Sequence, residues 1–554
     1  MKKNEKKSTE KDQVLPGDGA LRQAIKSVRR AVDVNGNATN KHAIQIGKKW
    51  HFLDALELVN GKIDSLAKAS QASNLPIDLT KREYVELGAQ IAKAVRGSAV
   101  VLSSSGYHVV RWKGESYKAV VWRGEAHWIG EEPDAVVVIE DAVNLEIVEP
   151  VGDLEEWKAE IGTHFAKNPY MIVTLGAALS ALLIRPLALE RLMLLLVGES
   201  SIGKTAIQEA VQSIIRPGPV DSASGTVLGL QQQMSLQPDQ PVFFQETRQV
   251  SDASNLINLV FDHGNAGKRV VGHASQQAIE GKALHCVLIA SNERTIAEMV
   301  RSRNVTIDAG IGARVLELIV DGPHGAFHDV PESMEPAAFA EYLSASSESL
   351  YGALWDAWVE VLVTNHDELR EKAKTQIPKI RAWLEKKVET KDRILKRMLN
   401  GYAGWMFAIL SARRHELIEL TADEIKEAFA TVITAHKERA RGGLSSMDQE
   451  ILEEIRASID ENPSRFPPLS LVDRKKDGLW GYEHAVADED LYLVFKSSLG
   501  KIAKNHAERD VLRVLKASGM LKHNKDGLMY SVRTPESDMP KRFYAIRKSI
   551  RYDG

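Results

Sequence analysis

Residues 198–205 read Gly198-Glu-Ser-Ser-Ile-Gly203-Lys204-Thr205, a glycine-rich loop with the spacing of a phosphate-binding loop. Gly198 permits a tight exit from a strand, and Gly203 lets backbone N–H groups approach a β-phosphate. Lys204 can reach the β- and γ-phosphate oxygens, and the Thr205 hydroxyl is a ligand for Mg²⁺. The loop therefore predicts binding of a nucleoside triphosphate. The predicted binding residues are Gly198, Ser200, Ser201, Ile202, Gly203, Lys204, Thr205 and Ala206.

The context of the loop supports this interpretation. An apolar run over 192–197 precedes it and predicts a buried strand, and the pattern of residues 206–215 predicts a helix. A helix that begins at the loop adds its amino-terminal dipole to the phosphate site. The alternative, a glycine-rich turn with an incidental lysine, leaves this strand–loop–helix order unexplained.

A nucleotide-hydrolysing enzyme with such a loop also needs an acidic residue at the end of a neighbouring strand. The candidate is Glu246, which follows the apolar run 241–244 and is placed to polarise an attacking water and to hold Mg²⁺, partly through water. The preceding position, usually an aspartate, is Gln245. Because a neutral amide binds the metal shell more weakly than a carboxylate, hydrolysis is expected to be slow or to need compensation. An ordinary surface glutamate is the alternative.

Two further residues are candidates for the hydrolytic site. Asn292 follows the apolar run 285–290 and could orient water against the γ-phosphate, although asparagine is also a common turn residue. Arg314 precedes the run 315–320 and could reach the γ-phosphate of a neighbouring subunit as an arginine finger. Arg301 and Arg303 compete for that role, and a surface ion pair is the alternative for all three.

Residues 267–282 have glycine bounds and a β-branched centre, which predicts a β-hairpin. Its basic residues are Lys268, Arg269, His273 and Lys282. In a ring-shaped ATPase, such a hairpin could project into the pore and bind DNA phosphates. An exposed basic hairpin without a ligand is the alternative.

Strand and helix patterns around these residues predict an α/β fold. Strands at 192–197, 242–244, 287–290 and 315–320 alternate with helical segments, as in a parallel sheet covered on both faces. We expect a disordered tail (1–18), an N-terminal α/β domain (19–150), the nucleotide-binding core (151–335), a helical region (336–442) and a C-terminal domain (443–554). In the last, helices at 447–459, near 488–499 and at 507–518 precede two strands, which is typical of a winged helix.

Composition sets the remaining limits. The 554 residues suggest roughly three to four domains. Net charge is −3, but residues 495–554 hold 14 Lys and Arg against 6 Asp and Glu, a basic balance that fits DNA or a solvated face equally well. The single cysteine, Cys286, is expected in a buried strand. The apolar stretch 171–184 is too short to span a bilayer and predicts a buried helix. With no secretory signal visible, we expect a cytoplasmic protein without a membrane partner.

With these motifs assembled, residues from about 95 to 554 resemble the family catalogued as domain of unknown function 927, described as superfamily II helicase and inactivated derivatives. The resemblance rests on Gly106-Tyr-His108, Leu154-Glu-Glu-Trp157, Asn168-Pro169, the 198–205 loop, Phe244-Gln-Glu246, Gly267-Lys-Arg269, Ser291-Asn-Glu293 and Trp480-Gly-Tyr482. Two positions depart from the family pattern. Gln245 replaces an aspartate, and Ser-Asn-Glu replaces the more frequent Ser-Thr-Gly-Glu.

The resemblance implies an AAA+ ATPase, similar to the minichromosome-maintenance and superfamily 3 ring helicases of mobile genetic elements. It would use ATP and Mg²⁺ as a homohexamer on single-stranded or forked DNA, with a primase or other replication proteins as further partners. The competing interpretation is a nucleotide-switched DNA-binding or scaffold protein that hydrolyses ATP poorly. A small-molecule kinase with the same loop is disfavoured, because it leaves the helical region and the basic C-terminal segment without a role.

Overall fold

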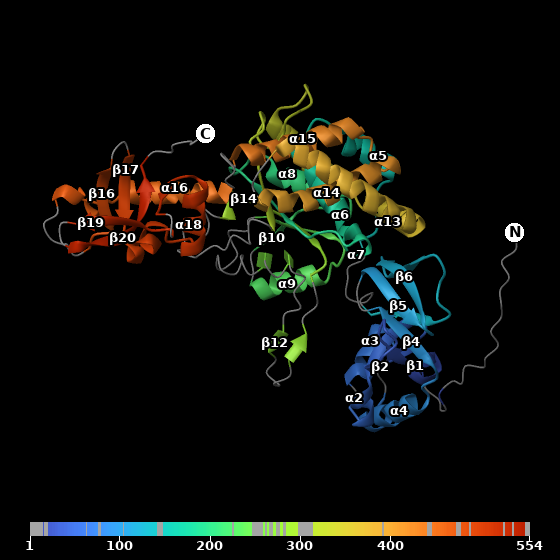
Figure 1. The fold of residues 1–554 in the computed structure, drawn as a ribbon. Coiled ribbons are helices and arrows are strands. Elements are labelled where there is room, and N and C mark those ends of the chain that lie inside the picture. Colours follow the sequence, from blue (N-terminus) through green and yellow to red (C-terminus); the bar gives the residue numbers. More distant parts are fainter. Residues whose placement is uncertain are drawn as a thin grey trace. The chain divides into compact units, whose positions relative to one another are not determined.

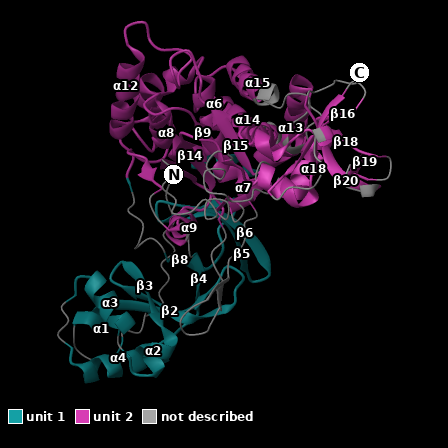
Figure 2. Ribbon diagram, turned by 90° about the vertical axis from the view of Figure 1, so that its left-hand side faces the viewer, with its two compact units in different colours: residues 1–148, 359–366 teal, residues 149–358, 367–554 magenta. Residues whose placement is uncertain are grey.

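The computed structural model describes residues 15, 20–62, 64–75, 79–102, 105–140, 148–223, 226–245, 259–260, 263–264, 270–272, 278–280, 284–296, 314–389, 393–439, 446–471, 478–486, 489–524, 527–534 and 537–548 (Figure 1). The chain divides into two compact units, residues 1–148 with 359–366 and residues 149–358 with 367–554 (Figure 2). The predicted disordered tail lies outside the described residues except for Leu15, which is buried.

The first unit is built on a five-stranded sheet in the order β3-β2-β1-β4-β8. Strands β1, β2 and β3 pair antiparallel, whereas β4 is parallel to both β1 and β8. A second sheet, β5-β6-β7, is an antiparallel meander. The strands are β1 (Ile25–Val32), β2 (Ala38–Ile46), β3 (Lys49–Asp54), β4 (Ser98–Leu102), β5 (Gly106–Trp112), β6 (Glu115–Trp122), β7 (Glu125–Ile129) and β8 (Val136–Ile139).

Helices and the meander bury the apolar side chains of this sheet. Leu66 and Leu87 pack with Val28 and Ile44 in one cluster, and Val100 packs with residues of the meander in another. The helices are α1 (Ala20–Ala24), α2 (Ala55–Val59), α3 (Asp64–Ala72) and α4 (Lys81–Lys93). The short apolar runs of the sequence near residues 99, 108, 119 and 135 form β4, β5, β6 and β8.

The second unit contains the strands that surround the candidate site. Its five-stranded sheet has the order β10-β11-β14-β9-β15, and every pair is parallel, so the predicted parallel sheet is confirmed. The strands are β9 (Met193–Val197), β10 (Asp221–Ser222), β11 (Pro241–Gln245), β14 (Val287–Asn292) and β15 (Val315–Ile319). Because β14 lies between β9 and β11, the carboxyl ends of these three strands are neighbours at one edge of the sheet.

Side chains alternate between the two faces of this sheet. Leu195, Phe244 and Leu288 pack with Leu230 and Met234 of α9 (Val227–Ser235) on one face. Leu194 and Phe243 are buried as well, and the period of a strand places them on the other face. Two further helices, α6 (Pro169–Ser180) and α8 (Lys204–Gln212), contact β11 and β14.

Helix α6 confirms the prediction of a buried helix over 171–184, since every one of its residues is buried. Among the described residues, one segment, Pro169–Leu187, is long and apolar enough to cross a membrane, and 83% of its most apolar window is buried inside the fold. A β-carbon on Gly176 would lie 3.1 Å from the carbonyl oxygen of Trp405, so the glycine permits close packing of α6 against α14 (Arg393–Arg414). Helix α6 is thus a core element of the second unit.

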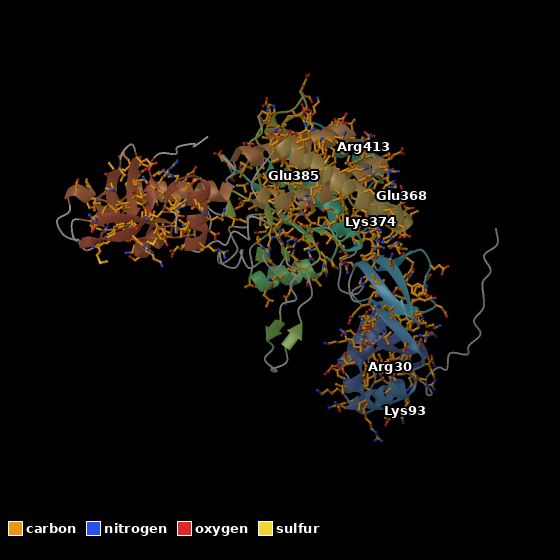
Figure 3. All side chains as sticks on the ribbon, viewed as in Figure 1. Arg30, Lys93, Glu368, Lys374, Glu385 and Arg413 are labelled. Atoms are coloured by element: carbon orange, nitrogen blue, oxygen red, sulfur yellow. The ribbon has the colours of Figure 1, made fainter. Side chains whose placement is uncertain are left out.

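Within residues 336–442 the structure has the helices α12 (Pro336–Ser349), α13 (Ala353–Val388), α14 and α15 (Ala422–Arg439). Two ion pairs join α13 to α14, Glu385 with Lys396 at 3.1 Å and Glu368 with Arg414 at 3.4 Å. Figure 3 labels the two glutamates on α13. The shorter helices of the unit are α5 (Leu154–Glu160), the 3₁₀ turns η2 (Gly162–Phe165) and η3 (Ala181–Leu183), and α7 (Ile184–Leu187).

The C-terminal part contains helices and a second antiparallel sheet in the order β16-β17-β20-β18, with β19 also paired to β20. The helices are α16 (Ser446–Asp460), η6 (Pro463–Arg465), η7 (Leu469–Leu471), η8 (Lys496–Ser498), α17 (Leu499–Ile502) and α18 (Glu508–Ala517). The strands are β16 (Gly481–Val486), β17 (Glu489–Val494), β18 (Leu521–Lys522), β19 (Tyr530–Thr534) and β20 (Ser537–Arg547). The predicted helices near 447 and 507 and the final pair of strands are confirmed.

The helix predicted near 488–499 is wrong, because residues 489–494 form β17. Leu491 and Leu493 are buried in a cluster with Tyr482 of β16 and Phe543 of β20. The buried leucines alternate with more exposed residues, which is the period of a strand between two others. Only the last part of the predicted segment is helical, as η8 and α17.

Candidate nucleotide-binding site

The loop of residues 198–205 connects β9 to α8, which begins at Lys204. Gly203 has a φ of +102°, and a β-carbon there would lie 2.7 Å from Cε2 of Phe327. A β-carbon on Gly198 would lie 2.7 Å from Cδ1 of Ile202 and 3.0 Å from the carbonyl oxygen of Val320. Gly203 is therefore required by its backbone conformation and by close packing, and Gly198 is required by close packing.

Lys204 has a buried side chain whose Nζ donates hydrogen bonds to the carbonyls of Gly198, at 2.9 Å, and of Glu199. Burial lowers the pKa of this ammonium group, and the charge of Glu293 opposes that effect. Both hydrogen-bond acceptors are neutral carbonyls of the loop itself. The ammonium group is thus held beside the first turn of α8, where backbone N–H groups lack intrahelical partners, and this combination suits a phosphate anion.

Residues 325–327, which follow β15, pack against the phosphate loop. The motif of the loop did not predict this contact. The backbone N–H of Ala326 donates to the carbonyl of Ile202 at 2.7 Å. Gly325 has a φ of +73°, and a β-carbon on it would lie 2.7 Å from the same carbonyl oxygen. Phe327, which contacts Gly203, packs edge-on against Phe339 of α12 with ring centroids 4.9 Å apart. The glycines at 322 and 325 were the sequence signal for this turn.

Asn168 fixes the chain that follows Phe327. Its amide nitrogen donates to the carbonyls of His164 at 2.9 Å and Asp329 at 3.0 Å. Its amide oxygen accepts from the backbone N–H groups of His328 at 2.8 Å and Asp329 at 3.0 Å. This buried side chain, one residue before α6, therefore connects the start of that helix to the segment behind the phosphate loop.

The residues predicted at the neighbouring strand ends are partly described. Glu246 lies outside the described residues. Gln245 ends β11, and its Nε2 donates to the carbonyl of Val220 at 3.0 Å. The side chain of Gln208, one turn into α8, donates to the carbonyl of Phe244 at 3.0 Å. This bond fixes the helix that carries Lys204 against the end of β11.

Asn292 ends β14 directly beside the phosphate loop. Its carbonyl accepts from the backbone N–H of Gly198 at 3.1 Å, and its buried side chain donates through Nδ2 to the carbonyl of Arg294 at 2.8 Å. The residue that follows, Glu293, is exposed and was not singled out from the sequence. The sequence signal for it was its place immediately after Asn292.

Arg314 lies at the other edge of the sheet. It precedes β15, where Val315 pairs with Met193, and its carbonyl accepts from the backbone N–H of Met193 at 3.0 Å. Six strand residues separate this level from Gly198, about 20 Å at 3.3 Å per residue. The structure therefore does not bring Arg314 to the phosphate loop of the same chain. Its guanidinium lies against Gly264, and burial, together with the charge of Arg397, lowers its pKa.

Other predicted residues are described only in part. The hairpin expected at 267–282 is confirmed in its strands, since β12 (Val270–Gly272) and β13 (Ala278–Glu280) pair antiparallel as a separate two-stranded sheet. Lys268, Arg269, His273 and Lys282 lie outside the described residues, as do Arg301 and Arg303. Cys286 is buried, as predicted, and burial raises the pKa of its thiol to about 12.

Comparison with known proteins adds one family and one fold. Residues 108–274 match the family described as "Domain of unknown function (DUF927)". No curated protein matches the chain. A solved structure titled "SCCmec type IV Cch - active helicase" has a TM-score of 0.69 at 13% identity and covers 95% of this chain and 94% of its own. A second, the apo NrS-1 C-terminal region, has a TM-score of 0.25 at 14% identity over 73% of this chain and 90% of its own, and carries no argument.

These comparisons bear on the family resemblance and on the fold. The similarity to Cch extends over nearly the whole chain, so the two proteins share a fold although their sequences have diverged. The matched family segment contains the phosphate loop, β11 and the first strand of the hairpin. The family predicted from the order of the motifs is the one that residues 108–274 match, and the fold of the chain is similar to that of Cch.

Proposed function

We propose that the protein is an AAA+ ATPase that works as a homohexameric DNA helicase and translocates on forked or single-stranded DNA by ATP hydrolysis at subunit interfaces. The observation that carries this proposal is the meeting of three strand ends. The phosphate loop after β9, Asn292 at the end of β14 and Gln245 at the end of β11 are neighbours at one edge of a parallel sheet. Lys204 is buried at that edge with its ammonium group on neutral carbonyls.

Each residue has a role in this proposal. The loop N–H groups and Lys204 bind the β- and γ-phosphates, and Glu246 orients the attacking water with help from Asn292. Mg²⁺, held by Thr205 and, partly through water, by Glu246, would neutralise charge on the phosphates. Arg314 lies too far from its own loop, so it serves as an arginine finger only from a neighbouring subunit. The distance between Arg314 and the phosphate loop of the same chain supports this role in a neighbouring subunit.

DNA binding is assigned to two elements. The hairpin β12–β13 would grip the phosphate backbone through Lys268, Arg269, His273 and Lys282. The C-terminal part, in which α18 precedes the β19–β20 hairpin, is the proposed winged helix, and residues 495–554 carry a net charge of +8. We further propose that the protein belongs to a mobile element or phage, works in the cytoplasm and cooperates with a primase or other replication proteins.

ATPase activity with and without DNA tests the enzymatic part of this proposal. We expect DNA to stimulate hydrolysis by the full-length protein. Lys204→Ala and Glu246→Gln should each lower the rate by at least about 100-fold, because each removes a group that acts on the transferred phosphate. Equal rates in the wild type and both variants would contradict it.

A nucleotide-switched DNA-binding or scaffold protein remains the second candidate, and Gln245 favours it. The Gln245 side chain donates to Val220, on the side of β11 away from β14, so the residue supplies no charge to a metal beside the loop. The variant Gln245→Asp separates the candidates. A large gain over negligible wild-type turnover supports the switch, whereas little change shows that the wild-type site already hydrolyses ATP.

A further inference from the structure

Glu293 occupies the centre of the edge at which the three strand ends meet. Asn292 pairs with Val197, so the next residue on β14 is level with Gly198, the first residue of the phosphate loop. On its other side β14 pairs with β11, where Ala290 is level with Phe244. Glu293 therefore lies between the phosphate loop and the end of β11, and its side chain is exposed.

The backbone at this position is fixed on both sides. The N–H of Gly198 donates to the carbonyl of Asn292 at 3.1 Å, and the side chain of Asn292 donates to the carbonyl of Arg294 at 2.8 Å. The carboxylate of Glu293 also lies close enough to Lys204 to oppose the effect of burial on the pKa of that ammonium group. A negative charge is thus placed beside the group that would contact the β- and γ-phosphates.

A carboxylate beside the phosphates is unfavourable for the nucleotide alone, because both are anions. It becomes favourable when a divalent cation lies between them, since Mg²⁺ takes one or two protein carboxylates in addition to phosphate oxygens. This carboxylate usually comes from the position that Gln245 occupies here. The amide of Gln245 instead donates to the carbonyl of Val220, on the side of β11 away from β14. Among the described residues at the loop, the Thr205 hydroxyl and the Glu293 carboxylate are oxygen donors of the type that Mg²⁺ prefers, in addition to the water-mediated contact proposed for Glu246.

We propose that Glu293 supplies the carboxylate that holds Mg²⁺ on the bound nucleotide, directly or through a water, in place of the acid that is missing at position 245. This inference rests on the proposed function, in which the 198–205 loop binds ATP. The negative charge that Gln245 does not supply to the metal would come from a residue at the end of β14, the strand next to the loop. Glu246 keeps its proposed roles of orienting the attacking water and of contacting Mg²⁺ partly through water.

The test measures the affinity of the full-length protein for a fluorescent ATP analogue in Mg²⁺ and in EDTA. In the wild type, Mg²⁺ should strengthen binding. In Glu293→Gln, the affinity in Mg²⁺ should fall by at least about tenfold, the effect of losing one charged ligand, while the affinity in EDTA is unchanged or higher because a repelling charge is gone. Adding Gln245→Asp to this variant should restore the effect of Mg²⁺.

Glu341→Gln is the matched control, because Glu341 is an exposed carboxylate on α12 and should leave both affinities unchanged. A wild-type response to Mg²⁺ in Glu293→Gln would overturn the inference and leave the proposed function standing. Loss of binding in EDTA as well would also overturn it, since Glu293 would then hold the loop and not the metal. If the wild type bound no nucleotide in either condition, the proposed function would fail and this inference with it.

Discussion

At the scale of single residues, Gly203 connects the conformation of the phosphate loop to the packing behind it. Its φ of +102° is one that an alanine rarely adopts, and the added β-carbon would lie 2.7 Å from the ring of Phe327. Gly203→Ala should therefore strain or move the loop, at a cost of about 1–3 kcal/mol. We expect its affinity for an ATP analogue, measured by fluorescence titration, to fall at least about tenfold.

Gly114 provides the matched control for that variant. It has a φ of +89°, but a β-carbon on it would meet no atom within 4 Å, and it lies in the turn between β5 and β6. Gly114→Ala should share the backbone strain without changing the affinity for nucleotide. Equal nucleotide affinities in Gly203→Ala and the wild type would contradict the assigned loop geometry.

Residues that act through local chemistry could be identified from the sequence, and residues that act through the fold could not. Gly203 and Lys204 were recognised because their spacing in one short loop determines how they meet a phosphate. Asn168 and Glu293 were not assigned to the site, because their positions depend on segments far away in the chain. Asn168 reaches residues 328–329, and Glu293 is placed by the register of β14 against β9.

At the scale of elements, the turn after β15 holds the phosphate loop in place, and Asn168 holds the chain that follows that turn. Asn168→Ala leaves two partly buried backbone N–H groups, of His328 and Asp329, without this acceptor. We expect a loss of about 2–4 kcal/mol in stability. Nucleotide should raise the midpoint of the thermal transition in which the nucleotide-binding core unfolds. Asn168→Ala should lower the midpoint of that same transition and should also weaken nucleotide binding.

Asn400→Ala is the control for this loss of an asparagine, because the Asn400 amide donates to Glu190 at the surface. The free energy of unfolding of Asn400→Ala should lie within about 0.5 kcal/mol of that of the wild type, so its transition midpoint should hardly change. If Asn168→Ala unfolded at the same temperature as Asn400→Ala, the turn after β15 would not depend on Asn168.

Elements with a strong period were predicted well, and elements defined by their neighbours were not. The parallel strands and the helices from α12 to α15 follow patterns that extend over several turns or a continuous apolar run. Strand β17 was mistaken for a helix, because a segment of six residues carries too few apolar positions to separate the two periods. Its pairing with both β16 and β20 decides the conformation.

At the scale of the whole molecule, the account requires that ATP turnover at the sheet edge moves DNA. The fold of this chain is similar, over 95% of its length, to that of the structure titled "SCCmec type IV Cch - active helicase". The proposed arginine-finger role of Arg314 requires a neighbouring subunit, because Arg314 lies about 20 Å along the sheet from the loop of its own chain. The proposed DNA contacts at Lys268 and Arg269 belong to a hairpin that is separate from the five-stranded sheet (Figure 1).

The most direct measurement is displacement of a labelled strand from forked DNA by the full-length protein with ATP and Mg²⁺. We predict displacement by the wild type, none by Lys204→Ala, and none by the double variant Lys268→Ala with Arg269→Ala. The double variant should still bind ATP, because neither residue belongs to the proposed nucleotide-binding set. ATP hydrolysis by assembled wild-type protein without displacement of any forked substrate would contradict the helicase assignment.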